Sequence, residues 1–204
     1  MFLKDIASYY TDKLILHGET PLGVDWNGKE SQELRFQQLL KVIPHNNYPF
    51  SVNDFGCGFG SLFSFMKAKY KDFEYFGNDV SEEMIRTAIK RNKNSANAHF
   101  LKSEKPINLS DYSIASGIFN VKLKNDIKTW ERYLLKTLNL LNQRSKKGFS
   151  FNCLTSYSEI DKMKEHLYYA NPCYLFDICK RKFSRNVSLL HDYKLYEFSI
   201  IVRK

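Results

Sequence analysis

The sequence predicts an α/β protein with a doubly wound, mostly parallel sheet that ends in an antiparallel hairpin. Short apolar runs alternate with amphipathic helical stretches through most of the chain, which is typical of parallel strands covered by helices. Near the carboxyl end, residues 187–191 and 196–202 form two strand-like runs joined by a short turn. The first observation predicts the parallel part of the sheet and the second predicts the hairpin.

The elements follow one another in a regular order. Phe36, Leu39 and Ile43 fall at helical spacing and Pro44 ends the run, which predicts a helix ahead of the sheet. The strands are expected at residues 50–55, 73–78, 98–102, 112–116, 149–154, 187–191 and 196–202, which makes a seven-stranded sheet. In the last strand, alternate residues from 196 to 202 are apolar and are expected to share one face.

Helices are expected between these strands. Leu62, Met66 and Tyr70 share one face of a helix after the first strand. Ser81 is a suitable amino-terminal cap for the next helix. A long helix spans residues 127–141, and Asn171 followed by Pro172 predicts the capped start of another.

Length and composition narrow the class of protein. A chain of 204 residues without repeats or linkers predicts a single domain, 1–204, with a helical cover over residues 1–46 and a core over 47–204. A hydrophobic fraction of 43% is typical of a globular protein and argues against a disordered chain. The amino terminus has no signal-peptide or membrane-span pattern, and the scattered cysteines support neither a zinc site nor a disulfide framework. We therefore expect a cytoplasmic protein without a metal.

A glycine-rich turn between the first strand and its helix is the strongest local signal. It reads Asp54-Phe55-Gly56-Cys57-Gly58-Phe59-Gly60, and such a turn lets a ligand approach the backbone closely. The dinucleotide fingerprint requires Gly or Ala at the position of Ser61, so the spacing argues against a nicotinamide cofactor. Asp54 would repel a pyrophosphate and attract an ammonium group. The ligand is expected to be cationic or zwitterionic at this point.

The turn resembles the first motif of class I S-adenosylmethionine-dependent methyltransferases, an acid followed after one spacer by Gly-x-Gly-x-Gly. The resemblance implies a Rossmann-like sheet, S-adenosylmethionine as cofactor, and contact of the turn with its methionine part. It also implies that Asp79, at the end of the second strand, accepts hydrogen bonds from the ribose hydroxyls. A carboxylate suits a vicinal diol because it can accept two such bonds.

The same resemblance implies further cofactor contacts. Val80 and Met84 would lie near the adenine. Ser103 or Glu104 would take the place of the acid that many relatives use to meet the adenine amino group. Ser116, Gly117 and Phe119 follow the fourth strand, whose end passes the transferred methyl group in this family.

The segment before the first strand is expected to cover the acceptor. It resembles the amino-terminal cover of small-molecule methyltransferases. Trp26 and the tyrosines Tyr9 and Tyr10 could form a lid that excludes water, and Arg35 could pair with a carboxylate or phosphate of the substrate. No catalytic residue is evident, but His17 and His191 are candidate bases because both are expected near the carboxyl edge of the sheet.

Three functions fit these patterns. The first is a methyltransferase that acts on a small acceptor. The formal net charge of +9 would favour an anionic acceptor. The second is an RNA methyltransferase, favoured by basic residues between 122 and 136 and between 180 and 185. The third is a non-catalytic S-adenosylmethionine-binding protein that regulates or scaffolds a partner. The acceptor and the oligomeric state are left open.

Overall fold

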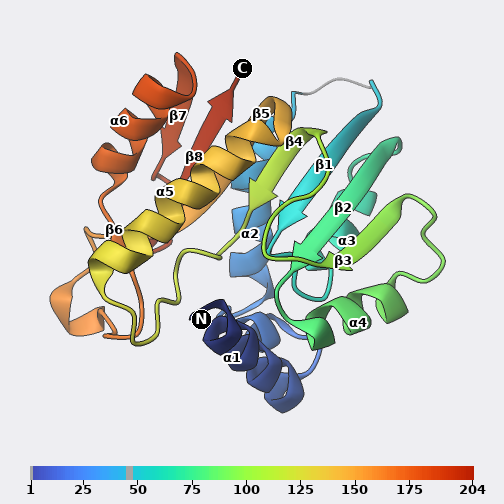
Figure 1. Cartoon of the computed structure of the whole chain (residues 1–204), viewed down its shortest axis with the longest axis horizontal. Coiled ribbons are helices and arrows are strands. Elements are labelled where there is room, and N and C mark those ends of the chain that lie inside the picture. Colours follow the sequence, from blue (N-terminus) through green and yellow to red (C-terminus); the bar gives the residue numbers. More distant parts are fainter. Residues whose placement is uncertain (1, 45–47) are drawn as a thin grey trace.

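A mixed sheet forms the centre of the computed structural model, which describes residues 2–44 and 48–204 (Figure 1). Its strands are β1 (Phe50–Phe55), β2 (Phe73–Asp79), β3 (Ala98–Lys102), β4 (Ser110–Ala115), β5 (Ser145–Thr155), β6 (Tyr169–Ala170), β7 (Asn186–Leu190) and β8 (Glu197–Arg203). Within the described residues the order is β3-β2-β1-β4-β5-β8-β7, and β6 pairs with β5 beside this path. Strands β1 to β6 pair in parallel, and β8 runs antiparallel to β5 and β7. The predicted fold class is confirmed.

The helices alternate with the strands as the sequence predicts. They are α1 (Phe2–His17), α2 (Lys29–Leu39), α3 (Ser61–Lys67), α4 (Glu82–Arg91), α5 (Ile127–Gln143) and α6 (Pro172–Lys182), with 3-10 turns η1 (Pro21–Val24), η2 (Leu40–Val42) and η3 (Ile160–Lys162). Ser81 caps α4 and Asn171 caps α6, each accepting a backbone hydrogen bond three residues on. Both predicted caps are confirmed. Strand β6 was not predicted, because two residues are too few to show a pattern.

Two hydrophobic layers hold the helices on the sheet. On one face, α5 and α6 pack against β4, β5 and β8 around Trp130, Phe149 and Phe198 (Figure 1). On the other face, α2, η2 and α3 pack against β1, β2 and β4 around Leu39 and Phe63. The central strands β1, β4 and β5 are therefore largely buried on both sides, whereas the edge strand β3 is mostly exposed.

The last strand is buried on both of its faces, which the sequence did not predict. Six consecutive residues of β8, Glu197 to Val202, are buried, whereas Tyr196 precedes the strand and is half exposed. Helix α2 contacts β8 and so does α6, so that both faces of the strand are covered. Burial on both faces leaves no reason for polar residues to alternate with apolar ones.

The amino-terminal cover lies at the carboxyl ends of the parallel strands. Figure 1 shows α1 below the arrowheads of β2 and β4. The Thr11 and Ser81 hydroxyls are 2.8 Å apart, which joins α1 to the start of α4, and Lys13 forms an ion pair of 2.8 Å with Asp25. The expected boundary between cover and core, at residues 46 and 47, lies outside the described residues.

Replacing Asn171 with alanine should destabilise the protein. The Asn171 Oδ1 atom accepts a bond of 3.0 Å from the Tyr174 amide, and loss of such a cap costs about 1 kcal/mol of unfolding free energy. Urea unfolding measures this change. A midpoint equal to that of the unaltered protein would contradict the capping role.

Candidate active site

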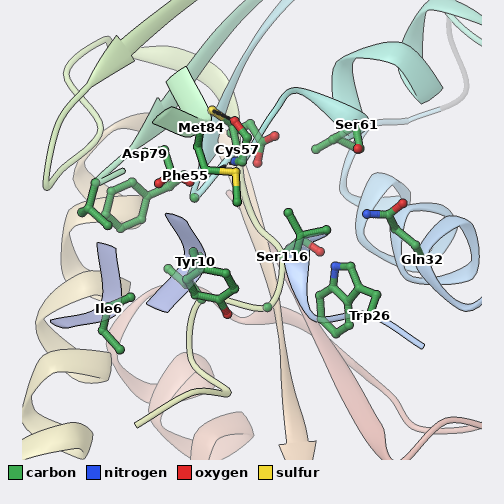
Figure 2. Close-up of a pocket in the computed structure, with 18 of the residues that line it drawn as sticks. Ile6, Tyr10, Trp26, Gln32, Phe55, Cys57, Ser61, Asp79, Met84 and Ser116 are labelled. Atoms are coloured by element: carbon green, nitrogen blue, oxygen red, sulfur yellow. Dashed lines mark hydrogen bonds between the residues drawn. The ribbon is translucent and has the colours of Figure 1, made fainter. Parts of the chain in front are cut away.

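A cavity lies at the carboxyl ends of β1, β2 and β4, under α1 (Figure 2). This is the point where the strand order reverses, since β2 leaves β1 on one side and β4 on the other. Open α/β sheets bind ligands in the crevice at such a point. The cavity is lined by Leu3, Ile6, Tyr10, Val24, Trp26, Gln32, Phe36, Asp54, Phe55, Gly56, Cys57, Gly58, Ser61, Leu62, Asp79, Val80, Met84, Ser116, Gly117, Ile118 and Tyr133.

The Asp79 carboxylate joins the glycine turn to the start of α4. One oxygen accepts a hydrogen bond of 2.9 Å from the Gly58 amide, and the other accepts one of 2.8 Å from the Ser81 amide. Each carboxylate oxygen can accept a second bond, so Asp79 can still receive two hydroxyl groups from the cavity. The carboxylate is thereby fixed in place before any ligand binds.

Gly58 allows the turn to pass close under the cover. Its backbone has a φ of +52°, in the left-handed region that favours glycine. A Cβ atom at this position would lie 3.0 Å from the Val24 side chain and 3.9 Å from the Met84 sulfur. Any larger residue would therefore strain the turn and fill part of the cavity.

Asp54 presents an unused acceptor to the cavity. Its Oδ2 atom accepts a hydrogen bond from the Tyr75 hydroxyl, while Oδ1 is buried and has no partner among the described residues. Burial raises the pKa of Asp54 to about 7, although the Tyr75 bond acts in the opposite direction. A cationic group placed beside Oδ1 would favour the charged carboxylate.

The structure gathers most of the predicted cofactor residues around this cavity. Those that line it are Asp54, Gly56, Cys57, Gly58, Asp79, Val80, Met84, Ser116 and Gly117. They come from the ends of three neighbouring strands and from the turns and the helix that follow them. Parallel strands bring these ends to one edge of the sheet, so residues distant in sequence meet there.

Four predicted residues do not line the cavity. Gly60 is the amino-terminal cap of α3, and a Cβ there would meet Asn92 rather than a ligand. Phe119 is fully buried in the core between β5 and α5. Ser103 and Glu104 lie where the chain turns outward after β3, and they line a separate surface cleft.

The predicted acceptor residues are placed differently from one another. Trp26 lines the cavity. Tyr9 does not, because its hydroxyl donates a bond of 2.7 Å to Asp25, whereas Tyr10 faces the cavity instead (Figure 2). One step along a helix rotates a side chain by about 100°, and this separates the two neighbours. Arg35 lies behind Trp26 and forms a buried ion pair with Glu197.

Neither candidate base reaches the cavity. His17 is the last residue of α1, and His191 lies in an exposed turn beside Tyr157. Among the residues described, the lining contains no histidine, lysine or arginine. Burial raises the pKa of Tyr10 far above its usual range and that of Tyr133 to about 12, so both phenols are protonated at neutral pH.

Other residues of the lining were not predicted. Leu3, Ile6 and Tyr133 supply apolar contact from α1 and α5, and Gln32 and Ser61 supply polar groups at one end of the cavity (Figure 2). The apolar side chains look like ordinary core positions in the sequence. Only the position of Ser61 at the first turn of α3, directly after the glycine turn, could have indicated a ligand contact.

Neither a membrane-spanning helix nor a metal-binding cluster is found in the described residues. No helix in residues 2–44 or 48–204 has the length and apolar character needed to cross a membrane. Within the same ranges, no group of three or more histidine, cysteine or acidic side chains is arranged to hold a metal ion.

Comparison with known proteins agrees with this geometry. Residues 52–128 match the family described as a methyltransferase domain. Rv1506c of Mycobacterium tuberculosis, whose name is that of a methyltransferase, is 53% identical over 156 residues, which cover 76% of this chain and 94% of the relative. The chain therefore belongs to the S-adenosylmethionine-dependent methyltransferase family.

Solved structures share the fold at low sequence identity. Magnesium protoporphyrin IX methyltransferase from Synechocystis PCC 6803 with bound SAH superposes with a TM-score of 0.65 at 13% identity, over 86% of this chain and 84% of that one. The DhpI–SAH complex gives a TM-score of 0.64 at 12% identity, over 98% and 95%. At this level of identity the likeness establishes the fold alone.

The affinity for the cofactor should depend on the ionisation of Asp54. If its carboxylate holds an ammonium group, binding S-adenosylhomocysteine (SAH) requires loss of the Asp54 proton, so affinity should rise by up to tenfold per pH unit until about pH 7 and then level off. Calorimetry at several pH values measures this rise, and Asp54→Asn should abolish it. A flat pH profile in the unaltered protein would contradict the assignment.

Removing the Asp79 carboxylate should weaken SAH binding more than removing a neighbouring charge. Hydrogen bonds to charged groups contribute about 1.5–3 kcal/mol, so Asp79→Ala should lower the affinity roughly ten- to hundredfold. Glu82→Ala is the matched control, because Glu82 lies three residues after Asp79, at the start of α4, but is exposed and pairs with Lys102. Equal affinities for the two variants would show that Asp79 does not contact the cofactor.

Proposed function

We propose that this chain transfers a methyl group from S-adenosylmethionine to a small molecule whose reacting part is uncharged. One observation carries the proposal: the cavity at the strand ends is covered on one side by α1, and its lining combines two carboxylates with aromatic and apolar side chains. A covered pocket of this kind suits a metabolite better than a polymer. The anionic acceptor predicted from the net charge finds no cationic partner in the described lining.

The residues present fit the cofactor on physical grounds. Asp54 has a buried oxygen without a partner, which would accept a bond from the cofactor's ammonium group. Asp79 is held by two backbone amides and would receive the ribose hydroxyls. Val80 and Met84 would contact the adenine, and Ser116 and Gly117 would lie beside the sulfur. When bound, S-adenosylmethionine supplies a methyl group attached to a sulfonium sulfur. The sulfur becomes a neutral thioether once the methyl group has been transferred.

The chain's own contribution is then orientation and the exclusion of water. Leu3, Ile6 and Tyr10 of α1 close the cavity, and Trp26 forms the wall next to Gly117. Holding a nucleophile in line with the methyl group removes much of the entropy cost of the reaction. Because the protonated phenols cannot act as bases and the described lining holds no cation, an amine that reacts as its uncharged free base is the acceptor group that fits best.

RNA methylation is a second candidate, and one observation favours it. A surface cleft beside the cavity shares Leu3 and Tyr133 with it and is bordered by Lys105, Arg132 and Lys136. These three cations are exposed and could contact phosphates. Helix α1, however, covers the direct approach to the cavity, and this favours the small acceptor.

Transfer of a radioactive methyl group tests both candidates and the non-catalytic alternative. Radiolabelled S-adenosylmethionine is incubated with the protein and either the ultrafiltered small molecules or the total RNA of one cell extract. We expect SAH to form and the label to enter the small molecules, but not with Asp79→Ala. Label in RNA, with binding that weakens steeply as salt rises, would support the RNA candidate. Failure to bind S-adenosylmethionine would overturn the proposal.

A further inference from the structure

A buried ion pair lies directly behind the cavity wall. Arg35 on α2 pairs with Glu197 on β8, and the two side chains are only 7% and 1% exposed. The Arg35 guanidinium also lies over the Trp26 ring, with its central carbon 4.0 Å from the ring centroid. Contact between an arginine and an indole face is favourable, and more so where water is excluded. One face of Trp26 is therefore supported by a charge that is itself held by β8.

The same ion pair is linked to the turn after β4. Glu197 accepts a hydrogen bond from the Asn152 side-chain amide, and the Asn152 carbonyl accepts one of 2.8 Å from the Gly117 backbone amide. Gly117 lies against Trp26, since a Cβ atom at Gly117 would be 2.4 Å from Trp26 Cζ2. The contacts form a closed ring through five residues: Trp26, Arg35, Glu197, Asn152 and Gly117.

Stability of the fold alone gives little reason for this arrangement. Burial lowers the pKa of Arg35 and raises that of Glu197, so each charge loses solvation inside the protein, and one Arg35 nitrogen, NH1, has no partner among the described residues. A buried ion pair can often be replaced by uncharged residues of similar volume at no loss of stability. An apolar pair would hold α2 on β8 equally well.

We propose that Arg35 and Glu197 are positioning residues for methyl transfer, which hold Trp26 and the Gly117 turn in fixed relation beside the reactive end of the cofactor. The proposal rests on the proposed function for its chemical meaning. Trp26 and Gly117 line the cavity, and Figure 2 shows Trp26 beside Ser116, on the opposite side of the space from Asp79. If the wall is already ordered before the cofactor binds, binding does not have to supply the free energy of ordering it.

Tryptophan fluorescence tests the positioning role without any ligand. The chain has two tryptophans, Trp26 and Trp130, and Trp130 is a core residue of α5. Replacing Trp130 with phenylalanine therefore leaves Trp26 as the only fluorescent tryptophan. In this background, Arg35→Met with Glu197→Gln removes both charges and keeps an acceptor for Asn152. We expect faster local motion in the time-resolved anisotropy of Trp26 and greater quenching by acrylamide, with the melting temperature unchanged or higher.

A second charge pair supplies the matched control. Asp177→Asn with Arg181→Met removes one acid and one arginine from the exposed surface of α6, where the pair spans 2.7 Å. This variant should leave the motion of Trp26 unchanged. If the Arg35 and Glu197 variant leaves Trp26 equally rigid, or loosens Trp26 only by melting the protein, the positioning role is excluded. Should that variant fail to fold, Arg35→Lys, which keeps the charge but loses the planar contact, must loosen Trp26.

Measuring SAH affinity in the same variants tests whether the order of Trp26 matters for cofactor binding. Loosening Trp26 should weaken SAH binding by about three- to tenfold, the cost of ordering one side chain. Unchanged affinity in a variant with a mobile Trp26 would contradict the role beside the cofactor. Absence of SAH binding in the unaltered protein would refute the proposed function instead, while the fluorescence result would still report on the wall, so the two failures are distinguishable.

Discussion

The Asp79 carboxylate is the contact on which the organisation of the site depends. It receives one amide from the glycine turn after β1 and one from the start of α4 after β2. These bonds fix the turn relative to the neighbouring strand, and the turn in turn sets the position of α3 and the floor of the cavity. The cost of burying the carboxylate is offset in part by the two amides, which leave its remaining acceptor capacity directed toward a ligand.

The cover completes the site by a different means. Helix α1 contributes apolar side chains. It is joined to the core by the hydroxyl contact between Thr11 and Ser81, and to the rest of the cover by the bonds that Tyr9 and Lys13 make with Asp25. These polar contacts are partly exposed, whereas Ile6 and Leu14 of α1 are buried against the core. Behind it, the buried Arg35–Glu197 pair keeps the Trp26 wall in place. The cavity is thus covered by α1 on one side and bounded by Trp26 on another.

The sequence predicted the parts of the structure that depend on local spacing. Strand, glycine turn and helix follow one another with characteristic residues, and Asp79 falls at the expected distance from the turn, so the meeting of these residues at one cavity could be predicted. The choice between Tyr9 and Tyr10 could not, because it depends on the rotation of α1 about its axis once docked. Arg35 was expected to meet substrate, but its partner Glu197 lies at the other end of the chain, and no local pattern connects them. Phe119 follows a motif strand, yet the chain buries it one turn beyond the cavity.

The structure of the protein crystallised with SAH tests the central claim most directly. We expect the ribose hydroxyls within hydrogen-bond distance of the Asp79 carboxylate, the ammonium group beside Asp54 Oδ1, and the sulfur facing Ser116, Gly117 and Trp26. A nucleoside bound away from Asp79, or a sulfur directed away from the Trp26 wall, would contradict it.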